Sequence, residues 1–154
     1  MAIEFLQRAV DLARENVAQG GGPFGAVIVR QGEVIATGVN RVTANLDPTA
    51  HAEVMAIRQA CERLQDFQLI DAILYTSCEP CPMCLGAIYW SRLQAVYFAC
   101  NRFDAAAAGF DDRFIYDEIP RAPSERRIPM HYLAIDSAHL PFQEWNHLEA
   151  KRRY

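Results

Sequence analysis

Three cysteines stand three residues apart in the stretch TSCEPCPMC, at Cys78, Cys81 and Cys84. Pro80 and Pro82 push the residues before them toward extended geometry, and proline is favoured at the first position of a helix. We therefore expect a helix to begin there, with Cys81 and Cys84 in its first turn, where side chains three apart share one side. Both sulfurs could then reach one Zn²⁺ at ~2.3 Å, and the helix N-terminus favours their thiolate forms.

A metal site needs a further ligand, and the stretch TAHAEV offers His51. We expect His51 in the first turn of its own helix, and helix N-termini that follow strands tend to gather at one edge of an α/β sheet. Three protein ligands, His51, Cys81 and Cys84, leave the fourth position of tetrahedral zinc to water, which is typical of a catalytic site. Cys78 precedes the turn, and we expect it to pack in the core or beside the site.

Glu53 follows His51 by two residues, where a carboxylate can face a zinc-bound water without binding the metal. H-x-E followed by P-C-x-x-C is the pattern of zinc-dependent nucleobase deaminases, and here it reads HAE at 51–53 and PCPMC at 80–84. Zinc lowers the pKa of its water toward 7. Glu53 would act first as base and then as acid, so that ammonia leaves an amino-substituted heteroaromatic ring.

The same residues have other interpretations. Cys78 or His131 could close the site into a structural one, which would lack an open position. A CxxC pair can be a redox centre, but that would leave His51 and Glu53 unexplained. Glu53 alone could be an exposed carboxylate in a favourable first helical turn.

The helices and strands that must position these residues are predicted from the periodicity of apolar side chains and from the positions of glycine and proline. A hairpin followed by alternating units predicts an α/β fold with a five-stranded mixed sheet and helices on both faces. The expected helices cover 3–19, 49–64, 81–91 and a C-terminal stretch from Ser137 or Pro141; the expected strands are a hairpin within 25–40 joined near Gln31 and Gly32, then 72–77, 94–100 and 130–136, with helical turns and loop at 101–118.

Length and charge limit the class of function. A chain of 154 residues predicts one domain with a sizeable core. The net charge of -4 and the lack of a basic face argue against nucleic acid and favour a small-molecule substrate. No window approaches the ~18 apolar residues of a membrane span, and the N-terminus reads as an amphipathic helix, so we expect a cytoplasmic protein. Thiols stay reduced there, and the odd count of five cysteines also argues against a disulfide framework.

The motifs resemble the cytidine deaminase-like superfamily and, within it, the bacterial guanine deaminases. The zinc motifs are common to the superfamily and imply only deamination, whereas GFDD and the C-terminal tyrosine point to guanine. The resemblance reaches across nearly the whole chain and is carried by GGPFGAVIV (21–29), LDPTAHAE (46–53), LYTSCEPCPMCLGAIYW (74–90), DAAAAGFDDRFIY (104–116) and KRRY (151–154).

The resemblance implies a three-layer α/β/α sandwich, one zinc per subunit, and hydrolysis of guanine to xanthine and ammonia. Asn40 would hydrogen-bond the purine, and Phe24 and Trp90 would wall the ring. Asp112 would be a second carboxylate that assists proton transfer, and Tyr154 would close the site. Without the resemblance, Asn40 reads as a turn residue, Asp112 as a helix cap, and Phe24 and Trp90 as core.

The resemblance also implies a homodimer of single-domain subunits, 1–154, in which the segment 137–154 can be exchanged. Tyr154 would then serve the neighbouring site. The alternatives are a guanosine deaminase, a tRNA adenosine deaminase, and a zinc-stabilised scaffold domain. The acidic balance argues against an RNA substrate, and a scaffold would have no use for Glu53.

Overall fold

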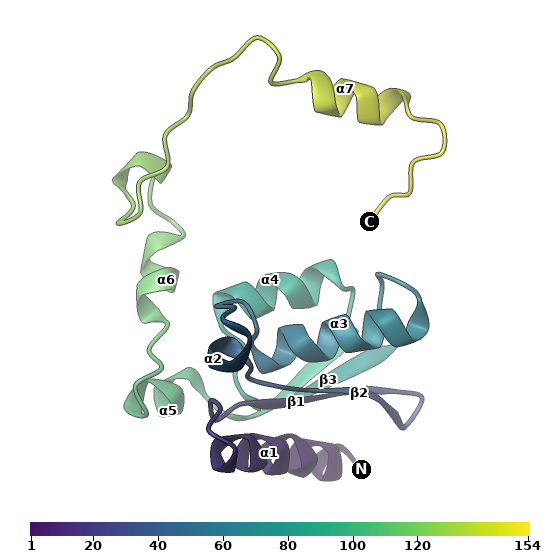
Figure 1. The fold of residues 1–154 in the computed structure, drawn as a ribbon, viewed down its shortest axis with the longest axis vertical. Coiled ribbons are helices and arrows are strands. Elements are labelled where there is room, and N and C mark those ends of the chain that lie inside the picture. The colour runs from purple at the N-terminus through teal and green to yellow at the C-terminus, as the bar shows by residue number, and fades with distance from the viewer. The chain divides into compact units, whose positions relative to one another are not determined.

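A four-stranded mixed sheet forms the centre of residues 1–112 in the computed structural model, which describes every residue of the chain (Figure 1). The strand order is β2-β1-β3-β4, with β1 antiparallel to both β2 and β3, and β3 parallel to β4. The strands are β1 (Gly25–Arg30), β2 (Glu33–Val39), β3 (Ala72–Cys78) and β4 (Ala95–Cys100).

Helices cover both faces of this sheet, as predicted. α1 (Ala2–Ala18) lies on one face, and α3 (Ala52–Leu64) and α4 (Pro82–Trp90) lie on the other (Figure 1). Two short helices, α2 (Val42–Asn45) and α5 (Arg102–Ala107), complete this unit. None of the helices has the length and apolar character that crossing a membrane would require.

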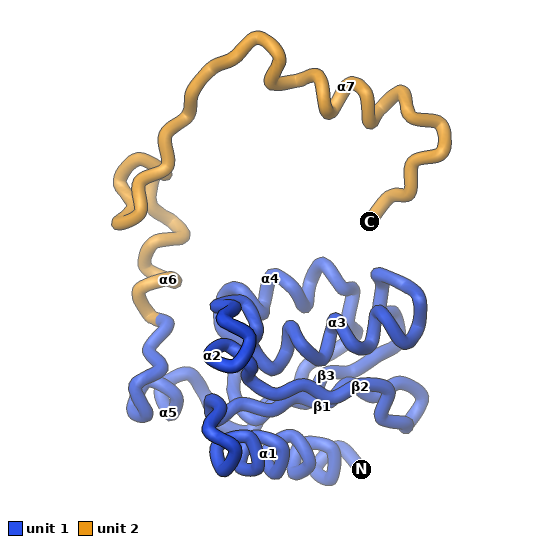
Figure 2. Tube along the Cα trace, viewed as in Figure 1, with its two compact units in different colours: residues 1–112 blue, residues 113–154 orange.

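Residues 113–154 form a second unit, drawn in orange in Figure 2. It contains α6 (Arg113–Glu118), a 3₁₀ helix η1 (Pro123–Glu125) and α7 (Leu140–His147). No residue of this unit is buried. Its apolar side chains, among them Tyr132, Leu133 and Ile135, are mostly open to solvent.

The predicted fifth strand, 130–136, is wrong: the sheet has four strands, and 130–136 forms no regular element. A strand forms only where a neighbour accepts and donates its backbone hydrogen bonds, and the sequence of 130–136 does not supply that neighbour. The C-terminal helix is also shorter than predicted, since it covers only Leu140–His147. The helix predicted over 49–64 begins at Ala52, because His51 is extended, with φ -69° and ψ 156°.

The hairpin between β1 and β2 turns at the two residues expected. Gln31 and Gly32 both have positive φ, 53° and 81°. A two-residue turn with both φ values positive matches the right-handed twist of the flanking strands. Glycine adopts this conformation without strain, and so Gly32 fixes the register of the hairpin.

The core has two layers, one on each face of the sheet. Alternate residues of β1 supply both, because successive strand side chains point to opposite faces. On the α3 and α4 side, the layer includes Ala26, Ile28, Leu74, Ala56 and Ile88. On the α1 side it includes Ala9, Val27, Val29 and Tyr75.

Close approach of α3 to β2 depends on Gly38. A Cβ at Gly38 would overlap the backbone oxygen of Ala52 and the backbone nitrogen of Ala56. Both atoms belong to α3, so the helix would have to move. We expect Gly38→Ala to lower the free energy of unfolding by about 1–3 kcal/mol, measured by urea titration of the metal-free protein.

Gly86→Ala is the matched control, because a Cβ at this helical position would meet nothing within 4 Å. It should leave stability unchanged or raise it by roughly 0.5–1 kcal/mol, since alanine is the better helix former. Equal unfolding midpoints for Gly38→Ala and the wild type would contradict the close approach described here.

Candidate metal centre and active site

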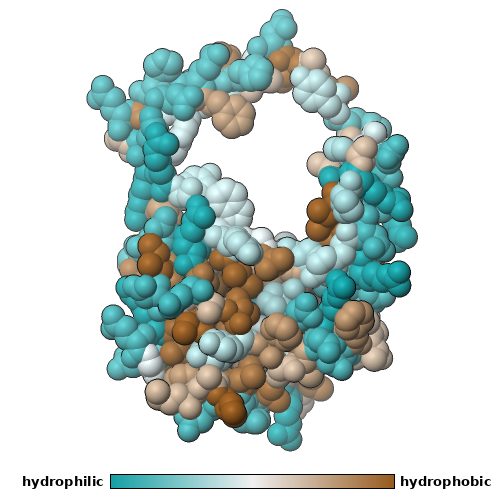
Figure 3. All heavy atoms as spheres, turned by 180° about the vertical axis from the view of Figure 1, so that it is seen from behind, coloured by the Kyte–Doolittle hydropathy of each residue, from teal (hydrophilic) through white to brown (hydrophobic).

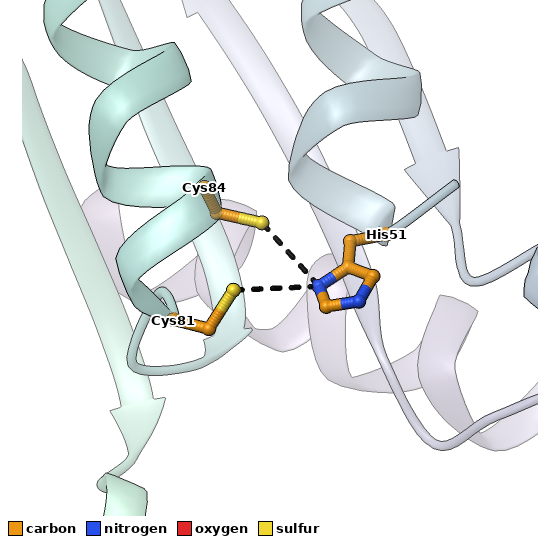
Figure 4. A group of neighbouring side chains, drawn as sticks. All are labelled: His51, Cys81 and Cys84. Carbon is orange, nitrogen blue, oxygen red and sulfur yellow. Dashed lines mark hydrogen bonds between the residues drawn. The ribbon is translucent and has the colours of Figure 1, made fainter. Parts of the chain in front are cut away.

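Two helix N-termini bring three metal-binding side chains together. His51 is the N-cap residue of α3, Cys81 is the N-cap residue of α4, and Cys84 lies in the first turn of α4. His51 Nδ1 is 3.5 Å from Cys81 Sγ and 3.5 Å from Cys84 Sγ (Figure 4). The three donor atoms all lie within 4.8 Å of one another.

These distances fit a tetrahedral zinc ion. Zinc–sulfur bonds of ~2.3 Å and a zinc–nitrogen bond of ~2.0–2.1 Å, at the tetrahedral angle, separate nitrogen and sulfur by about 3.5 Å. The observed separation is 3.5 Å for both pairs. One imidazole and two thiolates are also the ligand types that zinc prefers. The residues present therefore fit the metal.

The charges around the cluster call for a cation. Hydrogen bonding from the Cys84 thiol and from His51 lowers the pKa of Cys81 to about 4. The same hydrogen bond to Cys81, together with burial, raises the pKa of Cys84. The pKa values of the two thiols are thus pushed in opposite directions. A divalent cation supplies the charge that lets the second thiol ionise.

Glu53 faces this cluster from the first turn of α3. Its side chain is buried, and its Oε2 atom lies 3.4 Å from Cys84 Sγ. The hydroxyl of Thr76, in β3, donates a hydrogen bond of 2.9 Å to the other oxygen, Oε1. Burial raises the pKa of the Glu53 carboxyl. A carboxylate that is buried, held by Thr76 at one oxygen and in contact with the metal cluster at the other can transfer protons there.

Cys78 has a different environment, and the cluster includes neither it nor His131. The Cys78 thiol donates to the backbone oxygen of Asn101 at 3.6 Å. Burial raises the pKa of Cys78 to about 11, so it stays a neutral thiol. This placement agrees with the expectation that Cys78 packs beside the site.

Asn40 and Phe24 lie side by side at the ends of β2 and β1. The Asn40 backbone NH donates to the Phe24 oxygen at 3.2 Å, and the Asn40 side-chain oxygen accepts from the Val42 NH at 3.2 Å. The Phe24 ring meets the Phe110 ring edge-on, with centroids 5.0 Å apart. Phe24 therefore contacts the segment that leads to Asp112.

Asp112 is half-buried, and its pKa is raised by that burial and also by the negative charge of Cys81. The structure thus puts this second carboxyl within electrostatic reach of the metal ligands. Trp90 is remote from these ligands. Trp90 ends α4, nine residues after Cys81, which is about 13 Å along a helix axis. Tyr154 belongs to the second unit and is 71% exposed.

Comparison with known proteins agrees with this geometry. Residues 1–100 match the cytidine and deoxycytidylate deaminase zinc-binding region. Guanine deaminase from Bacillus subtilis (strain 168) is 58% identical over 151 residues, 97% of each chain. The chain belongs to the zinc-binding deaminase family.

Two further similarities show how far the likeness extends within the family. The X-ray structure of guanine deaminase from Bacillus subtilis superposes with a TM-score of 0.97 at 58% identity, covering 98% of this chain and 97% of that one. The tRNA-specific adenosine deaminase of Haemophilus influenzae is 36% identical and covers 74% of this chain and 66% of its own. Similarity to the guanine deaminase thus includes the C-terminal unit.

Two supporting residues of the deaminase site are absent from the sequence-based prediction. The buried amide of Asn16, in α1, donates to the backbone oxygens of Gly22 at 2.8 Å and Asn40 at 2.9 Å. Thr76 holds Glu53, as described above. In both cases the available signal was one polar residue on an otherwise apolar face of a helix or strand.

Proposed function

We propose that this protein is a guanine deaminase, which hydrolyses guanine to xanthine and ammonia. The observation that carries the proposal is near-full-length similarity to a guanine deaminase, combined with a three-donor cluster that the buried carboxylate of Glu53 faces. A zinc-stabilised scaffold would gain nothing from that carboxylate, because burying it costs free energy.

The residues around the cluster divide the chemistry between them. Zinc held by His51, Cys81 and Cys84 would supply a Lewis acid that makes water a nucleophile at neutral pH. Glu53 takes a proton from the attacking water and delivers it to the ring nitrogen beside C2 of guanine. As the C2–oxygen bond forms and the C2–N bond breaks, the departing amine needs a further proton. That proton comes from the hydroxyl newly bonded to C2, and Asp112, whose pKa is raised, would pass it to the amine.

The purine would lie against Phe24 and hydrogen-bond to Asn40. The amide of Asn40 offers both a donor and an acceptor, which suits the edge of a purine. Asn16 holds the backbone at Asn40, and Phe110 supports the Phe24 ring. Trp90 would complete the wall of the site and Tyr154 would close it, as the resemblance implies.

We further propose that two copies of the chain assemble and that the C-terminal segment, 137–154, serves the partner. β4 is an edge strand, and its side chains Tyr97 and Phe98 are about half exposed, while Trp90 of α4 is 63% exposed. Figure 3 shows hydrophobic side chains open on the surface of the molecule seen from behind. Residues 113–154 bury none of their own apolar side chains, so packing against a second copy would cover both surfaces.

Deletion of Tyr154 tests its role as a lid. A terminal residue carries little of the core, so zinc content and thermal stability should stay nearly unchanged. Turnover of guanine should nevertheless fall strongly, because the closed site excludes water and completes substrate contacts. Steady-state kinetics with metal analysis measures both, and full turnover by the truncated protein would end the lid hypothesis.

Mixed dimers test whether the tail crosses between subunits. The Tyr154 deletion and Glu53→Gln would each have little activity alone. After subunit exchange, one intact site can pair with one intact tail, so part of the activity should return. No rescue, with exchange proven by mass spectrometry, would show that the tail serves its own subunit.

A substrate panel tests the proposed function. The zinc-loaded protein is incubated with guanine, guanosine, adenine, cytosine and an adenosine-containing tRNA, and ammonia release is followed. We expect guanine to be the preferred substrate, with no turnover of tRNA. We also propose that the protein works in the cytoplasm. Preference for guanosine or for tRNA would replace guanine with the corresponding alternative.

A further inference from the structure

Thr76 is a hydroxyl in an otherwise apolar row of β3. Leu74 and Thr76 stand two residues apart, so they point to the same face of the sheet, toward α3. Thr76 is completely buried. Valine has nearly the same shape and an equal preference for strands, and it would avoid the cost of burying a hydroxyl. Packing therefore does not explain the hydroxyl.

The partner of this hydroxyl is Glu53. Thr76 Oγ1 donates to Glu53 Oε1 at 2.9 Å, while Glu53 Oε2 lies 3.4 Å from Cys84 Sγ. The last torsion of a glutamate side chain is broad and has two nearly equivalent positions. A hydrogen bond at one oxygen removes that freedom and leaves the other oxygen directed at the metal cluster.

β3 gives the hydroxyl a rigid base. Thr76 pairs with Ala26 of β1 on one side and with Phe98 of β4 on the other, in the middle of the sheet. Glu53 itself stands on a helix whose approach to the sheet is set by Gly38. The hydrogen bond to the proton-transferring group therefore joins two rigid elements.

We propose that Thr76 is a positioning residue that orients the Glu53 carboxylate for proton transfer. The proposal rests on the role of Glu53 in the proposed function. General acid–base transfer requires donor and acceptor within ~2.6–3.2 Å, and a misplacement of about 1 Å can cost ~10² in rate. The Thr76 hydroxyl donates to Glu53, which is not a metal ligand, and in the proposed mechanism it does not touch the substrate.

Thr76→Val and Thr76→Ser separate positioning from packing. Valine keeps the shape and loses the hydroxyl, so kcat should fall about 10- to 100-fold, with KM changed less than about threefold and zinc retained. Serine keeps the hydroxyl and loses the methyl, so kcat should remain within about threefold of the wild type. A purely structural role predicts the reverse order, and wild-type kcat in Thr76→Val would overturn the proposal.

If Thr76→Val does not fold, a second pair of variants still tests the proposal. Thr76→Ala and Thr76→Ser both lack the methyl group and differ only in the hydroxyl. The serine variant should therefore have the higher kcat by about tenfold or more. Equal kcat values in this pair would overturn the proposal.

A stability measurement on the metal-free protein needs no substrate. In the wild-type background, Thr76→Val leaves Oε1 of the buried Glu53 carboxyl without its donor and should lower the melting temperature. In a Glu53→Ala background the Thr76 hydroxyl is the group without a partner, so Thr76→Val should raise the melting temperature. Equal shifts in both backgrounds would overturn the proposal. This measurement uses no substrate, so its result does not depend on whether the wild-type protein deaminates guanine. A wild-type protein that fails to deaminate guanine would reject the proposed function instead.

Discussion

Glu53→Gln should reduce deamination of guanine by at least ~10² while the protein stays folded and keeps its zinc. Glutamine has the shape of glutamate and can still accept the hydrogen bond from Thr76 Oγ1. It cannot take a proton from water or pass one on. The three metal donors are unchanged, because the carboxylate is not among them. The measurements are kcat for guanine and zinc per chain by elemental analysis.

Stability serves as an internal control for this variant. A buried carboxyl whose pKa is raised by burial gains little from its charge, so the neutral amide should not lower the free energy of unfolding. Glu62→Gln is the matched substitution, since Glu62 is an exposed residue of the same helix. Kinetics within a few-fold of the wild type for Glu53→Gln would remove Glu53 from the mechanism.

Cys84→Ala should release most of the zinc and abolish deamination. The variant leaves only His51 and Cys81 as donors, and two ligands hold zinc far less tightly than three. The reaction then lacks the group that makes water a nucleophile at neutral pH. Zinc content after dialysis and turnover of guanine should fall together.

Cys78→Ala is a close control for the same experiment. Cys78 and Cys84 are both buried, and both substitutions remove one sulfur from the interior. Their packing costs are therefore similar, and they differ in whether the sulfur faces His51 or the backbone of Asn101. Cys78→Ala should retain zinc and activity. Equal zinc loss in the two variants would make Cys78 a ligand.

The metal site was predictable because short motifs mark its residues. Spacing and proline position put Cys81 and Cys84 at one helix start, and the rule that helix N-termini gather at a sheet edge added His51. The structure refines this only slightly, since His51 and Cys81 are N-cap residues one position outside their helices. Thr76 was not predictable, because no motif marks the hydrogen bond between its hydroxyl and Glu53.

The structure of the C-terminal part could not be predicted from the sequence. The sequence predicts a strand at 130–136, yet a strand depends on a partner that the residues themselves do not specify. Periodicity indicates which side chains seek burial but not which surface covers them. For Tyr132, Leu133 and Ile135 the covering surface proposed here belongs to a second copy of the chain.

The most direct test of the account is the fate of guanine in water labelled with ¹⁸O. Zinc-loaded protein should convert guanine to xanthine that carries one ¹⁸O atom, with one ammonia released for each xanthine formed, because water supplies the oxygen that replaces the amino group. Guanine recovered unchanged, or ammonia released without labelled xanthine, would contradict hydrolytic deamination at this site.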